Sequence, residues 1–436
     1  MNYMKYTNKK ELSKIELMPH QVEIFESSRD RNRVAYYLDM GLGKTFLGSE
    51  KLMQLGNKYN VVVCQKSKVA DWVEHFKTFY PDAHVIDYTK PRARIEPGIV
   101  VVNYELLWRR SEFAQLPDVT LLLDESSMIQ NETSKRARFI LQRMQYENVI
   151  LLSGTPTSGK YEKLWSQCRL LGWNVTKRDF YGRYIIEREI NIKTSQFPIR
   201  IVVGYRNVDE LKNMLRLYGA YFLKTEDVLE LPAQTFVNLD VQATPHYRKF
   251  QKHHIVELEN VTLVGDMTLN RLLYSRMLCG QYCKPKLEAF ADLLDSTEDR
   301  LIVFYNFNEE LAALKKVAKG RPISEINGSV KDLSAFEKHD NSVTFVQYQS
   351  GAMGLNLQKA NKIVYFTLPL SSELFEQSKK RTHRIGQKDT CFYYTLICKD
   401  TVEEKILDTL NMRRDYTDRL FKEQFENQRV TRKIVK

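Results

Sequence analysis

The sequence predicts an α/β protein with two parallel-sheet domains. Short apolar runs, rich in β-branched residues and separated by helical or turn segments, occur in both halves of the chain. These runs show no polar–apolar alternation, so both faces of each predicted sheet are covered. The first half also carries a Gly-Leu-Gly-Lys-Thr loop at 41–45, and the second half has no such loop. We therefore expect one nucleotide-binding domain and one domain without a phosphate loop of its own.

The composition indicates a globular, basic protein. A chain of 436 residues is too long for one ordinary core and suggests two or three domains. Its net charge of +12, from 66 lysines and arginines against 54 aspartates and glutamates, suits a polyanionic partner, although many basic proteins bind no nucleic acid. The sequence has no apolar run of about 18 residues, so no membrane helix is predicted. Its polar start lacks the core of a secretory signal.

The six cysteines are scattered, and most have apolar neighbours. This pattern predicts reduced thiols in an intracellular protein. Cys279 and Cys283, with His253 and His254 upstream, also allow a zinc site. The three-residue spacer and the lack of a second close pair favour buried thiols instead.

The segment Asp39–Thr45 predicts a phosphate-binding loop. Gly41 and Gly43 let the backbone turn its N–H groups toward a phosphate. Lys44 can reach the β- and γ-phosphates, and the Thr45 hydroxyl can take a site on Mg²⁺. An apolar run that reads as a strand precedes the loop, and a helical segment follows it. The loop therefore lies at a helix N-terminus, where the peptide dipoles favour an anion.

Two residues near the loop qualify this prediction. Leu38 stands where the full pattern has glycine, so the alternative is an ordinary strand-to-helix turn with a solvated lysine. Gln21, upstream of the loop, can read the edge of adenine through its paired donor and acceptor groups. Considered alone, Gln21 is interpreted as a solvated helix residue. Its position just upstream of the loop is what makes it a candidate adenine contact.

Further apolar runs of the first half are expected to form strands of one sheet. They span 61–63, 99–102, 121–123 and 149–152. Ligands gather at the carboxyl ends of such strands. Asp124 and Glu125 follow the third run and can hold Mg²⁺ and orient or deprotonate the attacking water, the alternative being an acidic turn. The turn at 153–156 can sense the γ-phosphate, or can be only a turn.

Other polar residues at strand ends are candidates for nucleic-acid contacts. Lys66 and Lys68 follow the run at 61–63, and Asn103 and Tyr104 follow the run at 99–102. Each supplies donors suited to a nucleic-acid backbone. The alternative for each pair is an ordinary solvated loop.

The second half of the chain predicts a helical segment and then a second sheet. Residues 161–294 are rich in charge and helix formers and read as insertion and linker material. Strand-like runs resume at 301–305, 343–346, 363–366 and 392–397. Arg381 and Arg384, three apart, are expected on one face of a helix turn. Their guanidinium groups suit the charge that develops on a transferring phosphoryl group, the alternative being a basic surface helix.

Together these stretches resemble the Swi/Snf-type DNA translocases of helicase superfamily two. The glutamine, the glycine loop, the Asp-Glu box and the Ser-Gly-Thr-Pro turn occur in the family's order. Gly354-Leu355-Asn356-Leu357 and the Arg-Thr-His-Arg-Ile-Gly-Gln box at 381–387 follow, and the latter is the most specific signature. Trp72 and the stretch Asn103–Leu107 also match the family. The resemblance covers roughly residues 15 to 412.

The resemblance implies two RecA-like parallel-sheet lobes with helical insertions between them and ATP with Mg²⁺ in the cleft. The expected boundaries are 1–160 for the ATP-binding lobe, 161–294 for the insertion and linker, 295–412 for the second lobe, and 413–436 for a basic C-terminal helix or tail. Catalytic roles fall to Lys44, Asp124, Glu125, Arg381 and Arg384. ATP contacts fall to Gln21, Gly41, Leu42, Gly43, Lys44, Thr45, Gly354 and Asn356, and metal contacts to Thr45 and Asp124. Coupling falls to Ser153, Gly154, Thr155 and Gln377, and DNA contacts to Lys66, Lys68, Asn103, Tyr104, Asn306, Gln349 and Ser350.

The chain departs from the family pattern at two places. The family's Asp-Glu-Ala-His box is Asp124-Glu125-Ser126-Ser127 here, so a serine replaces the histidine that links the carboxylates to other motifs. The family's Arg-Ala-Gly-Gly-Leu-Gly stretch is Gln349–Gly354 here. The coupling of hydrolysis to DNA is therefore expected to differ.

The expected function is an ATP-dependent translocase on double-stranded or branched DNA, with sequence-independent phosphate contacts. One alternative is a true strand-separating helicase or a fork-remodelling, annealing enzyme. Another is a nucleic-acid-binding scaffold with a weak ATPase. The absence of a recognisable targeting module favours phage or prokaryotic replication, recombination or repair, in the cytoplasm of a bacterial or phage-infected cell. No membrane partner is expected; protein partners and oligomeric state stay open, with a monomer as the working expectation.

Overall fold

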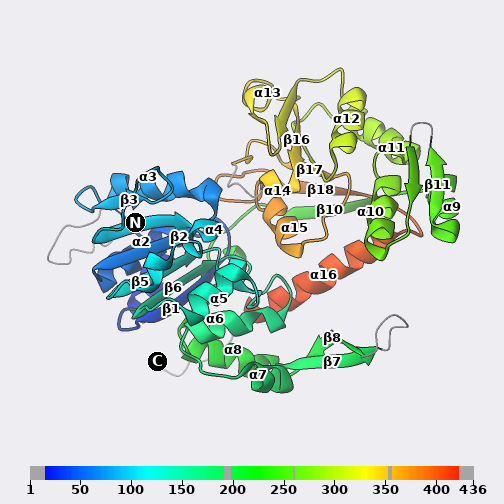
Figure 1. Cartoon of the computed structure of the whole chain (residues 1–436). Coiled ribbons are helices and arrows are strands. Elements are labelled where there is room, and N and C mark those ends of the chain that lie inside the picture. Colours follow the sequence, from blue (N-terminus) through cyan, green and yellow to red (C-terminus); the bar gives the residue numbers. More distant parts are fainter. Residues whose placement is uncertain (1–14, 191–197, 259–260, 352–355, 422–436) are drawn as a thin grey trace, which may run out of the picture. The chain divides into compact units, whose positions relative to one another are not determined.

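The computed structural model describes residues 15–190, 198–258, 261–351 and 356–421. These residues belong to two compact units. One contains the chain up to Val228 together with the segment from Tyr416 onward, and the other contains Leu229–Asp415. Each unit is built around its own sheet, which confirms the prediction of two sheets, and each sheet has seven strands (Figure 1).

The sheet of the first unit is parallel throughout, in the order β3-β4-β2-β5-β6-β1-β9. Its strands are β1 Arg33–Leu38, β2 Tyr59–Cys64, β3 Val85–Asp87, β4 Gly98–Asn103, β5 Val119–Asp124, β6 Asn148–Ser153 and β9 Ala220–Leu223. The central strands are buried along nearly their whole length. Their β-branched and leucine side chains face helices on both sides, which explains the lack of alternation in the sequence.

Helices and short turns connect these strands. They are α1 Pro19–Ser27, α2 Lys44–Leu55, η1 Lys66–Lys68, α3 Val69–Phe79, α4 Tyr104–Leu107, η2 Ser111–Ala114, η3 Ser126–Ile129, α5 Lys135–Gln142, η4 Tyr161–Leu164, α6 Trp165–Leu170, α7 Lys177–Tyr184, α8 Val208–Leu217 and η5 Thr225–Asp227. The helix α2 packs closely on β6, because a Cβ atom on Gly48 would lie 2.8 Å from Cδ1 of Leu152. Glycine at this position thus allows the helix that follows the predicted phosphate loop to pack closely on the sheet.

The sheet of the second unit has the order β10-β18-β17-β13-β16-β14-β15. Its strands are β10 Gln234–Val241, β13 Leu301–Tyr305, β14 Ile323–Ile326, β15 Lys331–Asp332, β16 Val343–Gln347, β17 Lys362–Tyr365 and β18 Cys391–Cys398. All neighbours pair in parallel except β14 and β15. Its helices are α9 Pro245–His253, α10 Thr268–Cys279, α11 Lys284–Asp295, α12 Asn308–Val317, α13 Ser334–Lys338, α14 Tyr348–Gly351, α15 Ser372–Lys379 and α16 Val402–Phe421. A buried ion pair of 2.6 Å between Lys286 and Glu403 joins α11 to α16.

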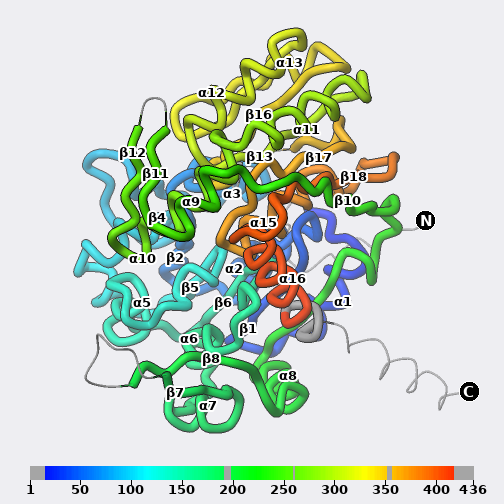
Figure 2. Tube along the Cα trace, turned by 90° about the vertical axis from the view of Figure 1, so that its right-hand side faces the viewer, coloured from blue at the N-terminus to red at the C-terminus, as the bar shows by residue number. Residues whose placement is uncertain are grey.

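The segment 161–294, expected to be helical insertion and linker, also supplies sheet strands. It contributes β9 beside β1 and β10 beside β18, each at the edge of its sheet. It further contains two antiparallel ribbons, β7 Ile185–Ile190 with β8 Ile199–Tyr205 and β11 Ile255–Leu258 with β12 Val261–Val264. In both views of the molecule α7 lies beside the β7–β8 ribbon (Figures 1 and 2). None of the helices in the described ranges is both long and apolar enough to cross a membrane.

Candidate nucleotide-binding site

The predicted phosphate loop joins the end of β1 to the start of α2. Gly41 has a φ of 87° and Gly43 a φ of 71°, both in the left-handed region that favours glycine. Gly43 is the N-cap of α2, so the first N–H groups of the helix open at the carboxyl edge of the sheet. A Cβ atom on Gly43 would lie 2.0 Å from Nε2 of Gln21. The local geometry is that of an anion-binding helix start.

Lys44 bends back over this loop. Its Nζ donates to the carbonyl oxygens of Leu38 at 2.8 Å and Asp39 at 3.0 Å. A Cβ atom on Gly154 would lie 3.5 Å from the same Nζ. The ammonium group therefore lies between the loop and the Ser-Gly-Thr-Pro turn that follows β6.

Gln21, the predicted adenine contact, is buried beside the loop. Its Nε2 donates to the carbonyl oxygens of Leu42 at 3.0 Å and Gly43 at 3.2 Å. Its Oε1 accepts from the backbone N–H of Met18 at 2.7 Å. The side chain thus connects the start of α1 to the loop backbone, a role that the sequence prediction did not include.

Asp124 and Glu125 lie at the carboxyl end of β5, in the same sheet as the loop. The indole Nε1 of Trp72, on α3, donates to Oδ2 of Asp124 at 2.8 Å. Burial raises the pKa of Asp124, and the Trp72 hydrogen bond and the charge of Lys44 oppose that rise. Glu125 has a left-handed φ of 53°, and its Oε2 accepts from Oγ of Ser153 at 3.2 Å. Both carboxylates are held from outside their own strand.

Two of the four DNA-contact candidates of the first unit are buried inside it. The hydroxyl of Tyr104 donates to the carbonyl oxygen of Asp124 at 2.9 Å, and Asn103 caps α4 by accepting from the N–H of Leu106. Lys66 is exposed, and Lys68 pairs with Asp71 at 2.8 Å. Only the two lysines of this group therefore present their side chains at the surface.

Arg381 and Arg384 lie in the second unit. The expectation that they share one face of a helix turn is wrong, because α15 ends at Lys379 and the chain turns before Arg381. Arg381 is buried, and its carbonyl oxygen accepts from the N–H of Leu357 at 3.1 Å. Gln387 donates to the carbonyl oxygens of Gln358 and Ala360. One backbone bond and the Gln387 side chain, rather than a helix, hold this box against residues 357–360.

The other candidates of the second unit differ in exposure. The amide nitrogen of Asn306 donates to the hydroxyl of Thr367 at 2.9 Å and to carbonyl oxygens beside it. Gln377 is buried and donates to Glu373, and Ser350 is buried. Gln349 and Asn356 are exposed, and Gly354 lies outside the described residues.

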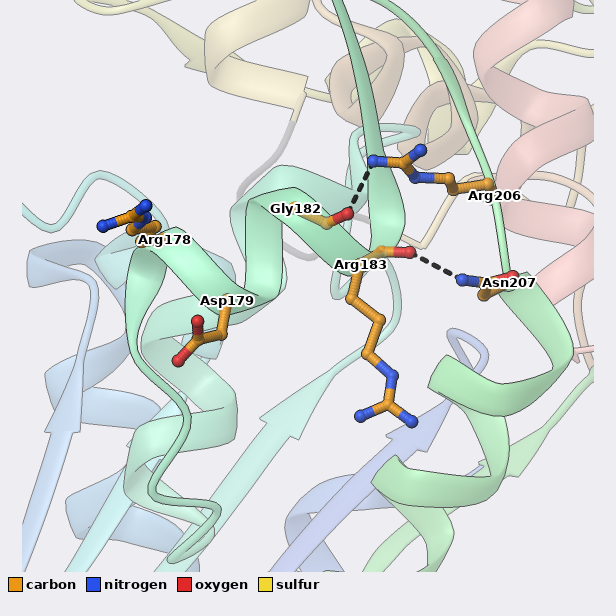
Figure 3. A pocket seen from close by; sticks show the side chains of 6 residues that line it. All are labelled: Arg178, Asp179, Gly182, Arg183, Arg206 and Asn207. Carbon is orange, nitrogen blue, oxygen red and sulfur yellow. Dashed lines mark hydrogen bonds between the residues drawn. The ribbon is translucent and has the colours of Figure 1, made fainter.

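Among the described residues, two further groupings of polar side chains contain none of the predicted site residues. A cavity of about 690 Å³ on α7 and the turn before α8 is lined by Arg178, Asp179, Gly182, Arg183, Arg206 and Asn207 (Figure 3). Arg183 is paired there with Glu210 at 2.6 Å. The side-chain amide of Asn207 donates to the backbone carbonyl oxygen of Arg183. These elements carry none of the predicted ATP or DNA residues.

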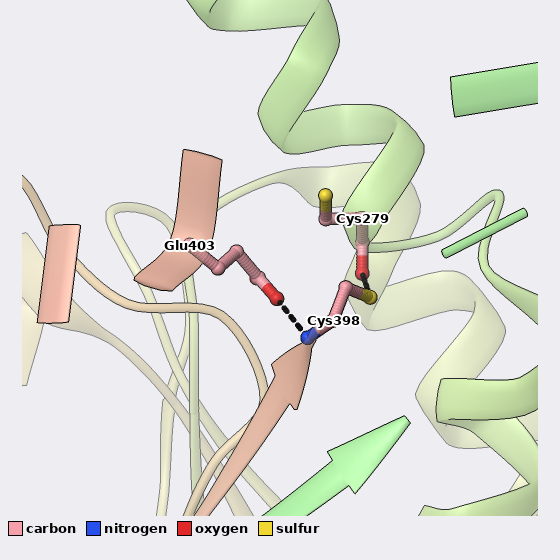
Figure 4. A group of neighbouring side chains, drawn as sticks. All are labelled: Cys279, Cys398 and Glu403. Carbon is pink, nitrogen blue, oxygen red and sulfur yellow. Dashed lines mark hydrogen bonds between the residues drawn. The ribbon is translucent and has the colours of Figure 1, made fainter. Parts of the chain in front are cut away.

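The second grouping is Cys279, Cys398 and Glu403, all buried (Figure 4). The carboxylate of Glu403 already accepts from Nζ of Lys286 and from the N–H of Cys398. Hydrogen bonding within the group raises the pKa of the Cys398 thiol. The burial of these cysteines and the pairing of Glu403 with Lys286 agree with the buried thiols that the sequence predicts.

Sequence reasoning assigned no role to two residues of the first unit that touch the site. The sequence identifies Trp72 only as a match to the family pattern, although an aromatic N–H donor in a helix beside an acidic strand end is a usable signal. Gln167, on α6, contacts three of the motif segments. A glutamine within a short helix gives no signal of that kind, because its partners meet only through the sheet topology.

Two family models match the chain. The SNF2-related domain matches residues 36–286, and the helicase conserved C-terminal domain matches residues 285–386. The chain is 23% identical to the ATP-dependent DNA helicase DDM1 of Arabidopsis thaliana, over 84% of this chain and 56% of the relative. It is 21% identical to the uncharacterized ATP-dependent helicase MG018 of Mycoplasma genitalium, over 86% of this chain and 39% of the relative.

The chain thus spans little more than half, or less, of the length of these relatives. Among solved structures, the SWI2/SNF2 ATPase core of Sulfolobus solfataricus in complex with double-stranded DNA matches with a TM-score of 0.48 and 19% identity. That match covers 95% of this chain and 94% of the other.

Proposed function

The chain belongs to the SNF2-related family, and on this basis we propose that it is an ATP-dependent translocase on double-stranded DNA. The observation that carries the proposal lies within the first unit. The N-terminus of α2, capped by Gly43 in the left-handed conformation, lies at the carboxyl ends of the sheet strands, as do Asp124 and Glu125. An anion site beside paired carboxylates is the arrangement that phosphoryl transfer to water requires.

The residues at this edge fit ATP with Mg²⁺. Thr45, in the first turn of α2, and Asp124 offer the oxygen ligands that Mg²⁺ prefers. The metal, when bound, would neutralise charge on the phosphate oxygens. Lys44 would exchange its bonds to the Leu38 and Asp39 carbonyls for phosphate oxygens. Glu125, held by Ser153, would orient or deprotonate the attacking water.

Arg381 and Arg384 are proposed to complete the site from the second unit. A guanidinium group stabilises the charge that develops on the γ-phosphate, so hydrolysis would depend on both units. Asn356 is proposed to contact ATP, and Gln377 is proposed to couple hydrolysis to movement. Alternation between ATP-bound and ADP-bound states would then move the protein along DNA.

DNA contacts are proposed chiefly at the exposed donors Lys66 and Gln349 and at the partly buried Lys68. Such contacts address phosphates, carry little sequence information and weaken with salt. Asn103, Tyr104, Asn306 and Ser350 would instead support the strand ends from inside. We further propose a role in phage or prokaryotic replication, recombination or repair.

Steady-state ATP hydrolysis tests this function. We expect strong stimulation of wild-type turnover by duplex DNA, and loss of that turnover in Lys44→Ala and Arg384→Ala. Lys58→Ala is the matched control, because Lys58 is exposed and directly precedes β2, at the amino end of that strand. Stimulation only by single strands or forks would favour a helicase or fork-remodelling enzyme. No turnover with duplex, fork, single-stranded DNA or RNA would contradict an active motor.

A further inference from the structure

Gln167 occupies the centre of a buried hydrogen-bond network in the first unit. The residue lies on α6 and has no exposed surface. Its Oε1 accepts from Oγ of Ser126 at 2.7 Å and from the hydroxyl of Tyr37 at 2.9 Å. Its Nε2 donates to the carbonyl oxygen of Pro156 at 2.8 Å. One amide group thus makes three buried hydrogen bonds.

The three partners come from three different motif segments. Tyr37 is in β1, one residue before the carbonyl that Lys44 binds. Ser126 directly follows Glu125, and Pro156 closes the Ser-Gly-Thr-Pro turn after β6. The strands β5, β6 and β1 are consecutive neighbours in the sheet. Gln167 therefore spans the carboxyl ends of the strands that carry the loop, the carboxylates and the turn.

The network depends on a residue at which this chain departs from its family. Ser126 stands where the family's Asp-Glu-Ala-His box has alanine, and alanine has no hydroxyl to donate to Gln167. Ser127 stands where the family has the histidine that links the box to other motifs. A connection from the box to the turn is nevertheless present, through Ser126, Gln167 and Pro156.

We infer that Gln167 is a positioning residue that couples the carboxylate box to the Ser-Gly-Thr-Pro turn. The inference rests on the proposed ATPase function. A buried amide is costly to leave without partners, so the three segments keep their spacing as a unit. A shift of the turn on phosphate binding would be passed through Pro156 and Gln167 to Ser126 and the adjoining Glu125. The direct bond from Ser153 to Glu125 provides a second link between the same two segments.

The test uses the full chain and two variants. Gln167→Leu removes all three hydrogen bonds, and Ser126→Ala removes one hydroxyl and restores the family residue. Duplex-stimulated kcat, the Kd for a fluorescent ATP analogue and the unfolding temperature are measured for each variant. Gln115→Leu is the control, because Gln115 is an exposed glutamine of the same unit.

We expect kcat to fall roughly 3- to 30-fold in Gln167→Leu, and less in Ser126→Ala, with Kd for the analogue within about twofold of wild type. The double variant is expected to lose little more than Gln167→Leu alone, because both changes interrupt one connection.

Wild-type kcat in both variants, with stimulation by duplex intact, would overturn the inference and leave the proposed function standing. A loss of nucleotide affinity as large as the loss of kcat, in the folded Ser126→Ala variant, would also overturn it, because the role would then be structural. Absence of turnover in the wild type would contradict the proposed function and the inference together.

Discussion

At the scale of single residues, the contact between Trp72 and Asp124 favours the charged form of a buried carboxylate. Burial alone raises the pKa of Asp124 and favours its neutral form. The indole N–H at 2.8 Å stabilises the charged form and fixes one carboxylate oxygen. The proposed Mg²⁺ contact would use the other oxygen.

Trp72→Phe tests this role. Phenylalanine keeps the stacking on Phe76 but removes the N–H donor. A hydrogen bond to a charged group contributes about 1.5–3 kcal/mol, so kcat should fall about tenfold or more. Since the lost donor lowered the pKa of Asp124, the acid limb of the pH–rate profile should move to higher pH.

Trp108→Phe serves as the comparison, because Trp108 contacts Glu105 at the surface. Equal pH–rate profiles and Mg²⁺ requirements for wild type and Trp72→Phe would show that the indole N–H has no influence on Asp124.

At the scale of elements, most of both sheets could be predicted from the sequence. Runs of valine, isoleucine and leucine have few alternatives to buried strands, and the glycine loop marks its helix. The edge strands β9 and β10 could not be found this way. β9 has only four residues, and β10 alternates between exposed and partly buried positions at the sheet edge. The pairing of such strands is decided by tertiary contacts rather than by local composition.

The same limit applies to the candidate site. The loop, Asp124 and Glu125 are recognisable because their chemistry is local in sequence. The burial of Tyr104 and the bonds of Gln167 depend on strands that meet only in the folded sheet. After α15 ends at Lys379, the arginine box is bonded to residues 357–360 through the Arg381 carbonyl oxygen and the Gln387 side chain, contacts that no helical periodicity reveals.

At the start of α12, the buried carboxyl group of Glu310 is expected to make the stability of the second unit depend on pH. Oε2 of Glu310 accepts from the N–H groups of Asn306 and Phe307 and from the hydroxyl of Thr367. Burial raises the pKa of Glu310 from 4.5 to about 7. A carboxyl whose folded pKa is raised stabilises the fold most below its unfolded pKa. Its contribution of about 3 kcal/mol is lost as the pH rises from about 4.5 to about 7.

Glu310→Gln should therefore raise the free energy of unfolding of the second unit at pH 7 and flatten its pH dependence. Chemical denaturation between pH 5 and pH 8 measures both. Glu309→Gln, on the exposed side of the same turn, should keep the wild-type dependence. An unchanged slope in Glu310→Gln would mean that the carboxyl is charged throughout this range.

At the scale of the whole molecule, two sheet units and a net charge of +12 suit a motor on a polyanion. The first unit contains the loop and the carboxylates, and the second unit contains the arginine box. The exposed lysines of the first unit can attract phosphates without reading bases. Binding should therefore weaken steeply with salt and depend little on DNA sequence.

We propose that the protein moves along duplex DNA, and displacement of a third strand from a triplex reports such movement. The wild type should release the third strand from an intact duplex track when ATP is present, while Lys44→Ala should release none. The two duplex strands should stay paired. Duplex-stimulated ATP hydrolysis without release of the third strand, in the wild type, would contradict translocation.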